Sequence, residues 1–117
     1  MSVVQDEPRV LAEKLATLGG PDINVWLNNS GGYIALNWSN SGAIGRWDYV
    51  ALFDTQPTDP NGYLTWQWQY TANQSSPYVT GTSAMGTQGP NYWIAYCAWD
   101  YRAKKYEIVT WAGPYQP

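Results

Sequence analysis

Short runs of aromatic and β-branched residues, separated by turn-forming residues, fill the chain from residue 22 onward. Such runs favour strands, because these side chains pack well on a pleated sheet and Gly, Asn and Pro interrupt it. We expect strands over 23–27, 33–38, 47–53, 63–70, 92–99 and 106–111, with a seventh over 78–82. The turn signals fall at 28–32, 39–42, 57–62 and 86–90. Six or seven short strands at this spacing predict an all-β fold, an antiparallel sandwich.

The N-terminal segment carries a helical pattern instead. Asp6 suits the N-cap position, and Pro8 suits the first turn, where a missing N–H costs nothing. Apolar residues repeat at helical spacing, at Val4, Leu11, Leu15 and Leu18. A helix over 6–18 is marginal alone, so we expect it to dock, most simply on a second copy. The sequence thus predicts a helical segment at 1–20, a sandwich domain at 21–117 and a homodimer through residues 6–18.

Alternation along the expected strands assigns their faces. In 63–70, one face carries Leu64, Trp66, Trp68 and Tyr70, and the other carries Thr65, Gln67 and Gln69. The side that carries Leu64 and the rings is expected to be core, and the side that carries Thr65, Gln67 and Gln69 is expected to be solvated. Tyr92 and Tyr96 are also expected in the core. Strands 47–53 and 92–99 carry aromatics on both faces, so one set must face solvent, the helix or a partner.

Three segments carry a resemblance to known domains: Trp47-Asp48-Tyr49-Val50-Ala51-Leu52-Phe53, Tyr63-Leu64-Thr65-Trp66 and Tyr92-Trp93-Ile94-Ala95-Tyr96. They resemble the strand pattern of SKICH-type immunoglobulin-like domains, as does the ending Trp111-Ala112-Gly113-Pro114-Tyr115-Gln116. The resemblance implies an immunoglobulin-like β-sandwich. The layout of a helix before such a sandwich is also similar to the fungal immunomodulatory proteins. That similarity implies dimerisation by the helix and sugar binding by the sandwich.

The residues that most enzymes use for catalysis are scarce. The chain has no histidine, which excludes Ser-His and Cys-His nucleophiles and histidine metal sites. Cys97 lies mid-strand between aromatics and is expected to be a small buried hydrophobe. Several carboxylates stand in turn contexts, where Asp commonly makes local hydrogen bonds. We therefore expect neither an enzyme nor a cofactor. A net charge of -3 argues against nucleic acids and anionic membranes as partners.

The chain contains eight tryptophans and ten tyrosines, more than a core of this size can hide. An aromatic ring matches the apolar face of a sugar, and neighbouring polar groups match its hydroxyls. Two neighbourhoods combine both features, around 38–48 and around 99–106. The candidate ligand-binding residues are Trp38, Asn40, Arg46, Trp47, Asp48, Trp99, Asp100, Tyr101, Arg102 and Trp111. The pattern predicts a non-enzymatic, lectin-like protein that binds glycans or glycoproteins.

Alternatives remain open at this point. Trp38, Trp47 and Trp99 would also suit a core, and Arg46 with Asp48 would also suit a solvated ion pair. The chain could instead be a dimeric immunomodulatory or protein-interaction module, or a small membrane-active toxin. No run reaches the roughly 18 apolar residues of a membrane span, and charges interrupt residues 1–20. The expected location is cytoplasmic, or secreted without a cleaved signal peptide.

Overall fold

The computed structural model describes residues 3–5, 23–40, 43–45, 47–69, 77–85 and 89–117. These residues form strands, turns and loops, and none of them is helical. The strands are β1 (Val3–Gln5), β2 (Ile23–Ser30), β3 (Tyr33–Asn40), β4 (Ala43–Gly45), β5 (Tyr49–Phe53), β6 (Thr65–Trp68), β7 (Tyr78–Ser83), β8 (Tyr92–Asp100) and β9 (Lys105–Tyr115). The predicted all-β class is confirmed, and each of the seven predicted strands has a counterpart in the structure.

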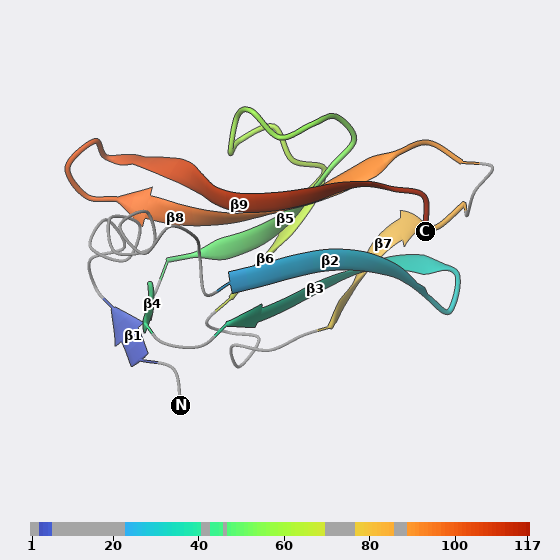
Figure 1. Ribbon diagram of the computed structural model, residues 1–117, viewed down its shortest axis with the longest axis horizontal. Coiled ribbons are helices and arrows are strands. Elements are labelled where there is room, and N and C mark those ends of the chain that lie inside the picture. Colours follow the sequence, from blue (N-terminus) through green and yellow to red (C-terminus); the bar gives the residue numbers. More distant parts are fainter. Residues whose placement is uncertain (1–2, 6–22, 41–42, 46, 70–76, 86–88) are drawn as a thin grey trace.

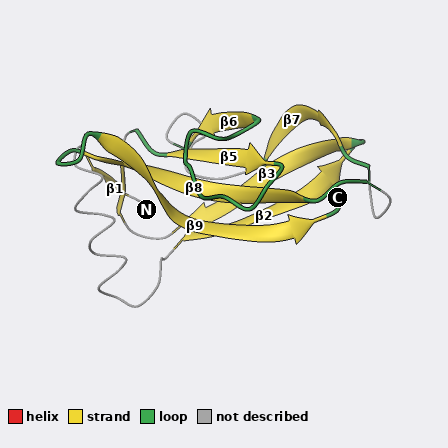
Figure 2. Ribbon diagram, turned by 90° about the horizontal axis from the view of Figure 1, so that it is seen from above, coloured by secondary structure: helices red, strands yellow, loops and turns green. Residues whose placement is uncertain are grey.

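Seven of the strands form two antiparallel sheets that lie face to face (Figure 1), and β1 and β4 form a separate two-stranded parallel sheet. One sheet has the order β2-β3-β7, and the other has the order β6-β5-β8-β9. Contacts of β2 with β8 and β9, and of β3 with β5, join the two layers. In Figure 2 the strands of both sheets run along the long axis of the molecule. The architecture is therefore sandwich-like, and each of the two sheets has one inner and one outer face.

The main core lies between the sheets. Alternate residues of β2, the middle of β3, and one face each of β5 and β8 supply its buried side chains: Ile23, Val25, Leu27, Ile34, Leu36, Trp38, Val50, Leu52, Tyr92, Ile94 and Tyr96. The expectation that Tyr92 and Tyr96 belong to the core is confirmed. Trp38 joins them at 1% exposure, so its ring is used for packing.

Strand β6 faces the opposite way from the prediction. Its register pairs Gln67 with Val50 and Trp66 with Ala51, which places Gln67 on the core side and Trp66 on the outer side. Accordingly Trp66 is 37% exposed, whereas Gln69 is 0% exposed. Alternation defines two faces but cannot say which is inside, and a shift of one residue exchanges them. Leu64 is exposed, and Tyr70 lies outside the described residues.

The N-terminal part differs from the prediction where it can be compared. Val4, assigned to the apolar side of a helix, lies in β1, which pairs in parallel with β4. Neither short strand was expected, because three residues give too little alternation to detect. The helix predicted over 6–18 lies outside the described residues, and dimerisation through it stays a prediction.

A buried polar contact ties the core to the start of β5. The Tyr96 hydroxyl donates a hydrogen bond of 2.6 Å to Asp48 Oδ2, and both side chains are fully buried. The Gln69 backbone N–H donates to the Asp48 carbonyl at 3.0 Å and thereby closes the β5–β6 pair. Burial, followed by the nearby Asp48 charge, raises the pKa of Tyr96 well above its ordinary value. The phenol therefore stays protonated and remains a donor to the carboxylate.

We expect Tyr96→Phe to lower the free energy of unfolding by about 1.5–3 kcal/mol, because a buried carboxylate loses a charge-assisted donor. Urea denaturation measures the change. Tyr33→Phe is the matched control, because Tyr33 is exposed, and a surface change of this kind stays within about 0.5 kcal/mol. Equal effects of the two substitutions would contradict a stabilising role for the Tyr96–Asp48 contact.

Candidate functional site

The tryptophans are distributed very unevenly between the two sheets. Cross-strand pairing and ring contacts place six of the eight on the outer side of the four-stranded sheet: Trp47, Trp66, Trp68, Trp93, Trp99 and Trp111. The other two, Trp26 and Trp38, belong to the three-stranded sheet. We call the outer side of the four-stranded sheet the aromatic face. Large exposed apolar surfaces of this kind commonly mark binding sites.

Tyr49 lies at the centre of the aromatic face, almost fully buried beneath other rings. Its ring contacts four others edge-on, with centroids 4.7 to 6.3 Å away: Tyr63, Trp66, Trp68 and Tyr106. Trp66 and Trp68 also contact each other at 4.6 Å. Edge-to-face pairs of this kind each contribute about 0.5–1.5 kcal/mol beyond area burial. The rings thus support one another and form a preorganised surface.

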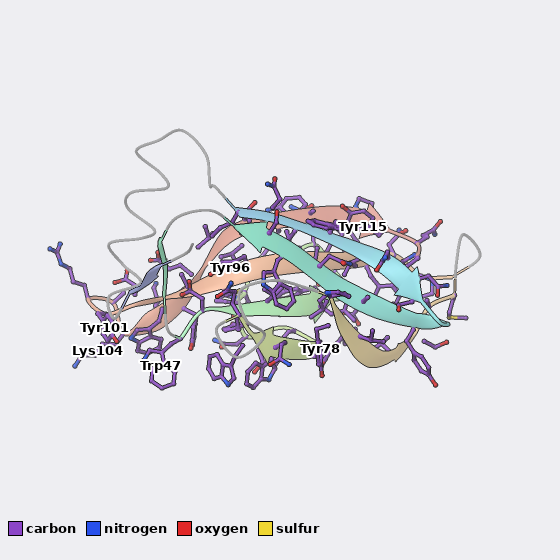
Figure 3. The ribbon with its side chains drawn as sticks, turned by 90° about the horizontal axis from the view of Figure 1, so that it is seen from below. Trp47, Tyr78, Tyr96, Tyr101, Lys104 and Tyr115 are labelled. Carbon is purple, nitrogen blue, oxygen red and sulfur yellow. The ribbon has the colours of Figure 1, made fainter. Side chains whose placement is uncertain are left out.

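Tyr106 links this cluster to the end of the sheet where the β8–β9 turn lies. Its ring packs 5.1 Å from that of Trp99, and its hydroxyl donates a 2.8 Å hydrogen bond to the Trp47 carbonyl. Trp47, Trp99, Tyr101 and Tyr106 together line a depression of about 260 Å³. Figure 3 shows Trp47, Tyr101 and Lys104 at this end of the molecule. Two segments distant in sequence, Trp47 and the β8–β9 hairpin, therefore build this aromatic depression.

The loop between β5 and β6 rises over the aromatic face (Figure 1). Asp59-Pro60-Asn61-Gly62 forms a tight turn, in which the Gly62 N–H donates to the Asp59 carbonyl and the Asn61 N–H donates to Asp59 Oδ1. The Tyr49 hydroxyl donates to the Pro60 carbonyl and so fastens the turn to the sheet. The turn predicted at 57–62 is confirmed, and its anchoring holds polar groups beside the rings.

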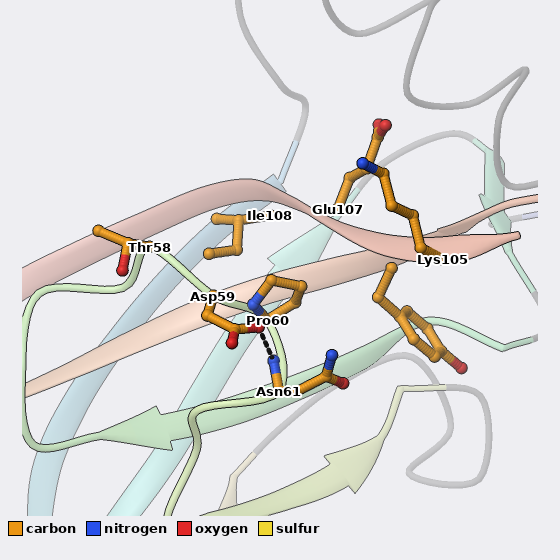
Figure 4. A pocket seen from close by; sticks show the side chains of 8 residues that line it. Thr58, Asp59, Pro60, Asn61, Lys105, Glu107 and Ile108 are labelled. Atoms are coloured by element: carbon orange, nitrogen blue, oxygen red, sulfur yellow. Dashed lines mark hydrogen bonds between the residues drawn. The ribbon is translucent and has the colours of Figure 1, made fainter. Parts of the chain in front are cut away.

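Two further depressions adjoin the loop. A small one of about 80 Å³ lies between Asn61 and the rings of Tyr49, Tyr63, Trp66, Trp68 and Tyr106. A larger one of about 520 Å³ lies between residues 58–61 and residues 105–108 (Figure 4). We call the larger one the polar groove, since Asp59, Asn61, Lys105 and Glu107 line it. Its size falls within the range of about 300–1,000 Å³ that is usual for ligand sites.

The structure divides the first predicted neighbourhood. Trp47 is 47% exposed and lines the aromatic depression, as a binding residue should. Trp38 and Asp48 are buried between the sheets, which matches the alternative that Trp38 is core. The prediction that these two residues contact a ligand is therefore wrong, because neither side chain reaches solvent. Arg46 and the side chain of Asn40 lie outside the described residues.

The second neighbourhood lies at the β8–β9 turn. Tyr101 is exposed and Trp99 is half-buried, and both line the aromatic depression, while Arg102 is exposed in the turn. The prediction that Asp100 contacts a ligand is wrong, because the residue is buried. Its Oδ1 accepts hydrogen bonds from the N–H groups of Arg102 and Ala103 at 2.9 and 3.1 Å. Its carboxylate therefore shapes the turn. Trp111 is exposed on the same aromatic face, where it pairs with Ala95.

Sequence reasoning missed Trp66, Tyr106 and Asn61 as candidate binding residues. Trp66 was missed because its face of β6 was assigned to the core. Tyr106 closed the predicted neighbourhood 99–106 but was not itself named as a ligand contact, although it lies opposite Trp99 in the β8–β9 pair. Asn61 belongs to a turn that was expected, but only folding brings that turn over the aromatic face. A Trp-x-Trp alternation with glutamine between was the one available signal for β6.

The described residues offer no support for metal chemistry, since they contain no group of three or more His, Cys, Asp or Glu that could hold an ion. Cys97 is buried beneath the aromatic face, and burial raises the pKa of its thiol from 9.0 to about 12. The thiol therefore stays protonated and a poor nucleophile near neutral pH. Within the ranges described, no helix has the length and apolar character needed to cross a membrane.

We expect Cys97 to resist alkylation by iodoacetamide in the folded protein at pH 8 and to react fully in 6 M guanidinium. Only the unfolded chain exposes the thiol and lets it ionise near its ordinary pKa of 9.0. Because the folded pKa is raised, this group stabilises the fold below pH 9, and its contribution is lost as the pH rises toward 12. Mass spectrometry of the labelled protein is the measurement, and rapid labelling without denaturant would contradict burial of Cys97.

Comparison with known proteins identifies no relative. No family model matches the chain, no curated protein is similar to it, and no solved structure matches its fold. The chemistry of the aromatic face and of the polar groove beside it is therefore the basis on which a function can be argued.

Proposed function

We propose that the protein is a non-enzymatic carbohydrate-binding protein and that the aromatic face is its binding surface. The observation that carries this proposal is the placement of six of the eight tryptophans on one face of one sheet, beside a polar groove. Trp47, Trp66, Tyr101 and Trp111 each expose more than a third of their surface there. A core alone does not require rings so open to solvent.

Sugar recognition needs an apolar surface and polar groups side by side. Indole and phenol rings cover the C–H face of a pyranose, while amide, carboxylate and ammonium groups bond its hydroxyls. Trp47 and Tyr101 supply the apolar part, and Asp59 and Asn61 lie on the polar side. The surface is also held rigid by edge-to-face ring contacts, so that little side-chain order has to be gained on binding.

The strand order supports the immunoglobulin-like assignment within this proposal. The sheet β6-β5-β8-β9 has the order C′-C-F-G of such domains, and β2-β3-β7 has the order A-B-E. In this comparison the aromatic face is the outer face of the C′CFG sheet. The chain would then be a lectin-like protein on an immunoglobulin-like scaffold.

A second candidate, a protein-interaction module, is favoured by one observation. Trp, Tyr and Arg dominate the energetic centres of protein interfaces, and Tyr101 and Arg102 are exposed together at the β8–β9 turn. A concave site of a few hundred Å³ that combines apolar and polar groups is more typical of a small-ligand site than of a protein interface. The polar groove therefore favours the carbohydrate.

Tryptophan fluorescence titrated with a broad panel of glycans tests the carbohydrate proposal. We expect binding to change the emission, because Trp47 and Trp66 lie at the surface. Trp47→Ala should weaken binding about tenfold, which corresponds to a loss of about 1.4 kcal/mol, since a stacking ring is removed.

The matched control is Trp26→Ala, which removes a ring that is 39% exposed, against 47% for Trp47, but lies on the outer face of the opposite sheet. We expect this variant to bind as the unaltered protein does. If no glycan of the panel changes the emission, or if Trp26→Ala weakens binding as much as Trp47→Ala, the proposal is wrong. Binding of a protein partner without any glycan would favour the second candidate.

A further inference from the structure

We infer that the ligand is a linear, neutral oligosaccharide that lies across the aromatic face and enters the polar groove, rather than a single sugar ring. The inference rests on the proposed function and adds the length and charge of the ligand. It assigns a second part of the site to residues 58–61 and 105–108, which the excess of aromatic residues in the sequence does not indicate.

The three depressions are contiguous, which is the first support. Tyr106 lines all three of them, and Asn61 lines both the small aromatic depression and the polar groove. A ligand that leaves the aromatic depression at Trp47 and Tyr101 therefore passes over Tyr106 to reach the groove. A single sugar ring cannot occupy the aromatic depression and the polar groove together, whereas a chain of several rings can.

The chemistry of the groove gives the second support. Asn61 is exposed, and among the described residues no hydrogen bond of its side-chain amide is found, while its backbone N–H is used in the turn. The amide thus offers both a donor and an acceptor, the pair that a sugar hydroxyl requires. Figure 4 shows it on the groove side of the turn, opposite the strand that carries Lys105 and Glu107.

The charges of the groove indicate a neutral ligand. Asp59 brings a carboxylate to the turn side of the groove, and the chain carries a net charge of -3. An anionic sugar placed there would meet like charge, and a buried or partly buried like-charge contact is unfavourable. Neutral hexose units avoid this cost, while the Lys105 and Glu107 side chains extend from β9 away from the turn (Figure 4).

The groove is also held in place before a ligand arrives. The Tyr49 hydroxyl donates to the Pro60 carbonyl, and the Leu64 N–H donates to the Leu52 carbonyl at 2.7 Å, so the β5–β6 loop is tied to β5 at two points. Tyr49 itself is fixed by four surrounding rings. A preorganised groove lowers the entropy cost of binding an extended chain.

The test measures affinity against chain length with the intact protein. Isothermal titration uses the monosaccharide and the linear tetrasaccharide of four neutral series, built of glucose, N-acetylglucosamine, mannose and galactose. In at least one series we expect the tetrasaccharide to bind at least tenfold more tightly than the monosaccharide. A tetrasaccharide of galacturonic acid should bind no more tightly than the neutral monosaccharides.

Two variants locate the additional units. Asn61→Ala, at an exposed position in the groove, should remove most of the gain in affinity with chain length. Asn24→Ala, exposed on the outer face of the three-stranded sheet, is the matched control and should retain the gain. Unchanged thermal denaturation of each variant shows that its fold is intact.

The outcomes separate the two proposals. Equal affinity for the monosaccharide and the tetrasaccharide, or a gain with length that survives Asn61→Ala, overturns the inference but leaves carbohydrate binding on the aromatic face. Tighter binding of the galacturonic acid tetrasaccharide overturns the neutral ligand. An absence of binding to every sugar overturns the proposed function together with this inference.

Discussion

The burial of strand β5 on both faces is the constraint on which the rest of the molecule depends. All five of its residues are buried, with Val50 and Leu52 toward the other sheet and Tyr49, Ala51 and Phe53 toward the outside. An antiparallel sheet often leaves one face to water. Here the outer face needs its own cover, and aromatic side chains of β6, β8 and β9 with the β5–β6 loop provide it. The aromatic face exists because the central strand of its sheet is apolar on both sides.

The outer side of the four-stranded sheet thus has a second core, and its outermost rings are only partly covered. Its lower layer, around Tyr49 and Cys97, is buried, while its upper layer exposes the rings of Trp47, Trp66 and Trp111. The same edge-to-face contacts that stabilise the lower layer fix the orientation of the upper one. Structural packing and a binding surface are thus two sides of one cluster. Substitutions of its buried residues are expected to affect stability, and substitutions of its exposed rings are expected to affect binding.

Much of the fold could be predicted because its signals are local. Strand runs, the Asp59-Pro60-Asn61-Gly62 turn and the core positions of Tyr92 and Tyr96 follow from residue type and alternation. The candidate site was predicted only in part: Trp47, Trp99 and Tyr101 meet in one depression, but Trp38, Asp48 and Asp100 are buried for packing and turn formation. Nearness in sequence placed Trp38 beside Trp47. The structure places the Trp38 ring between the sheets and the Trp47 ring on the surface, and no local signal specifies this difference.

The sequence by itself determined the strands, their turns and an excess of aromatic rings over what one core can bury. The tertiary structure alone decided where the excess lies, because sheet order and register set which face of β6 points outward and which distant segments meet at Tyr106. It also decided that the polar groove exists at all, since its two walls are more than forty residues apart in the chain. Alternation fixes a pattern of two faces, but only pairing with neighbouring strands assigns one of them to water.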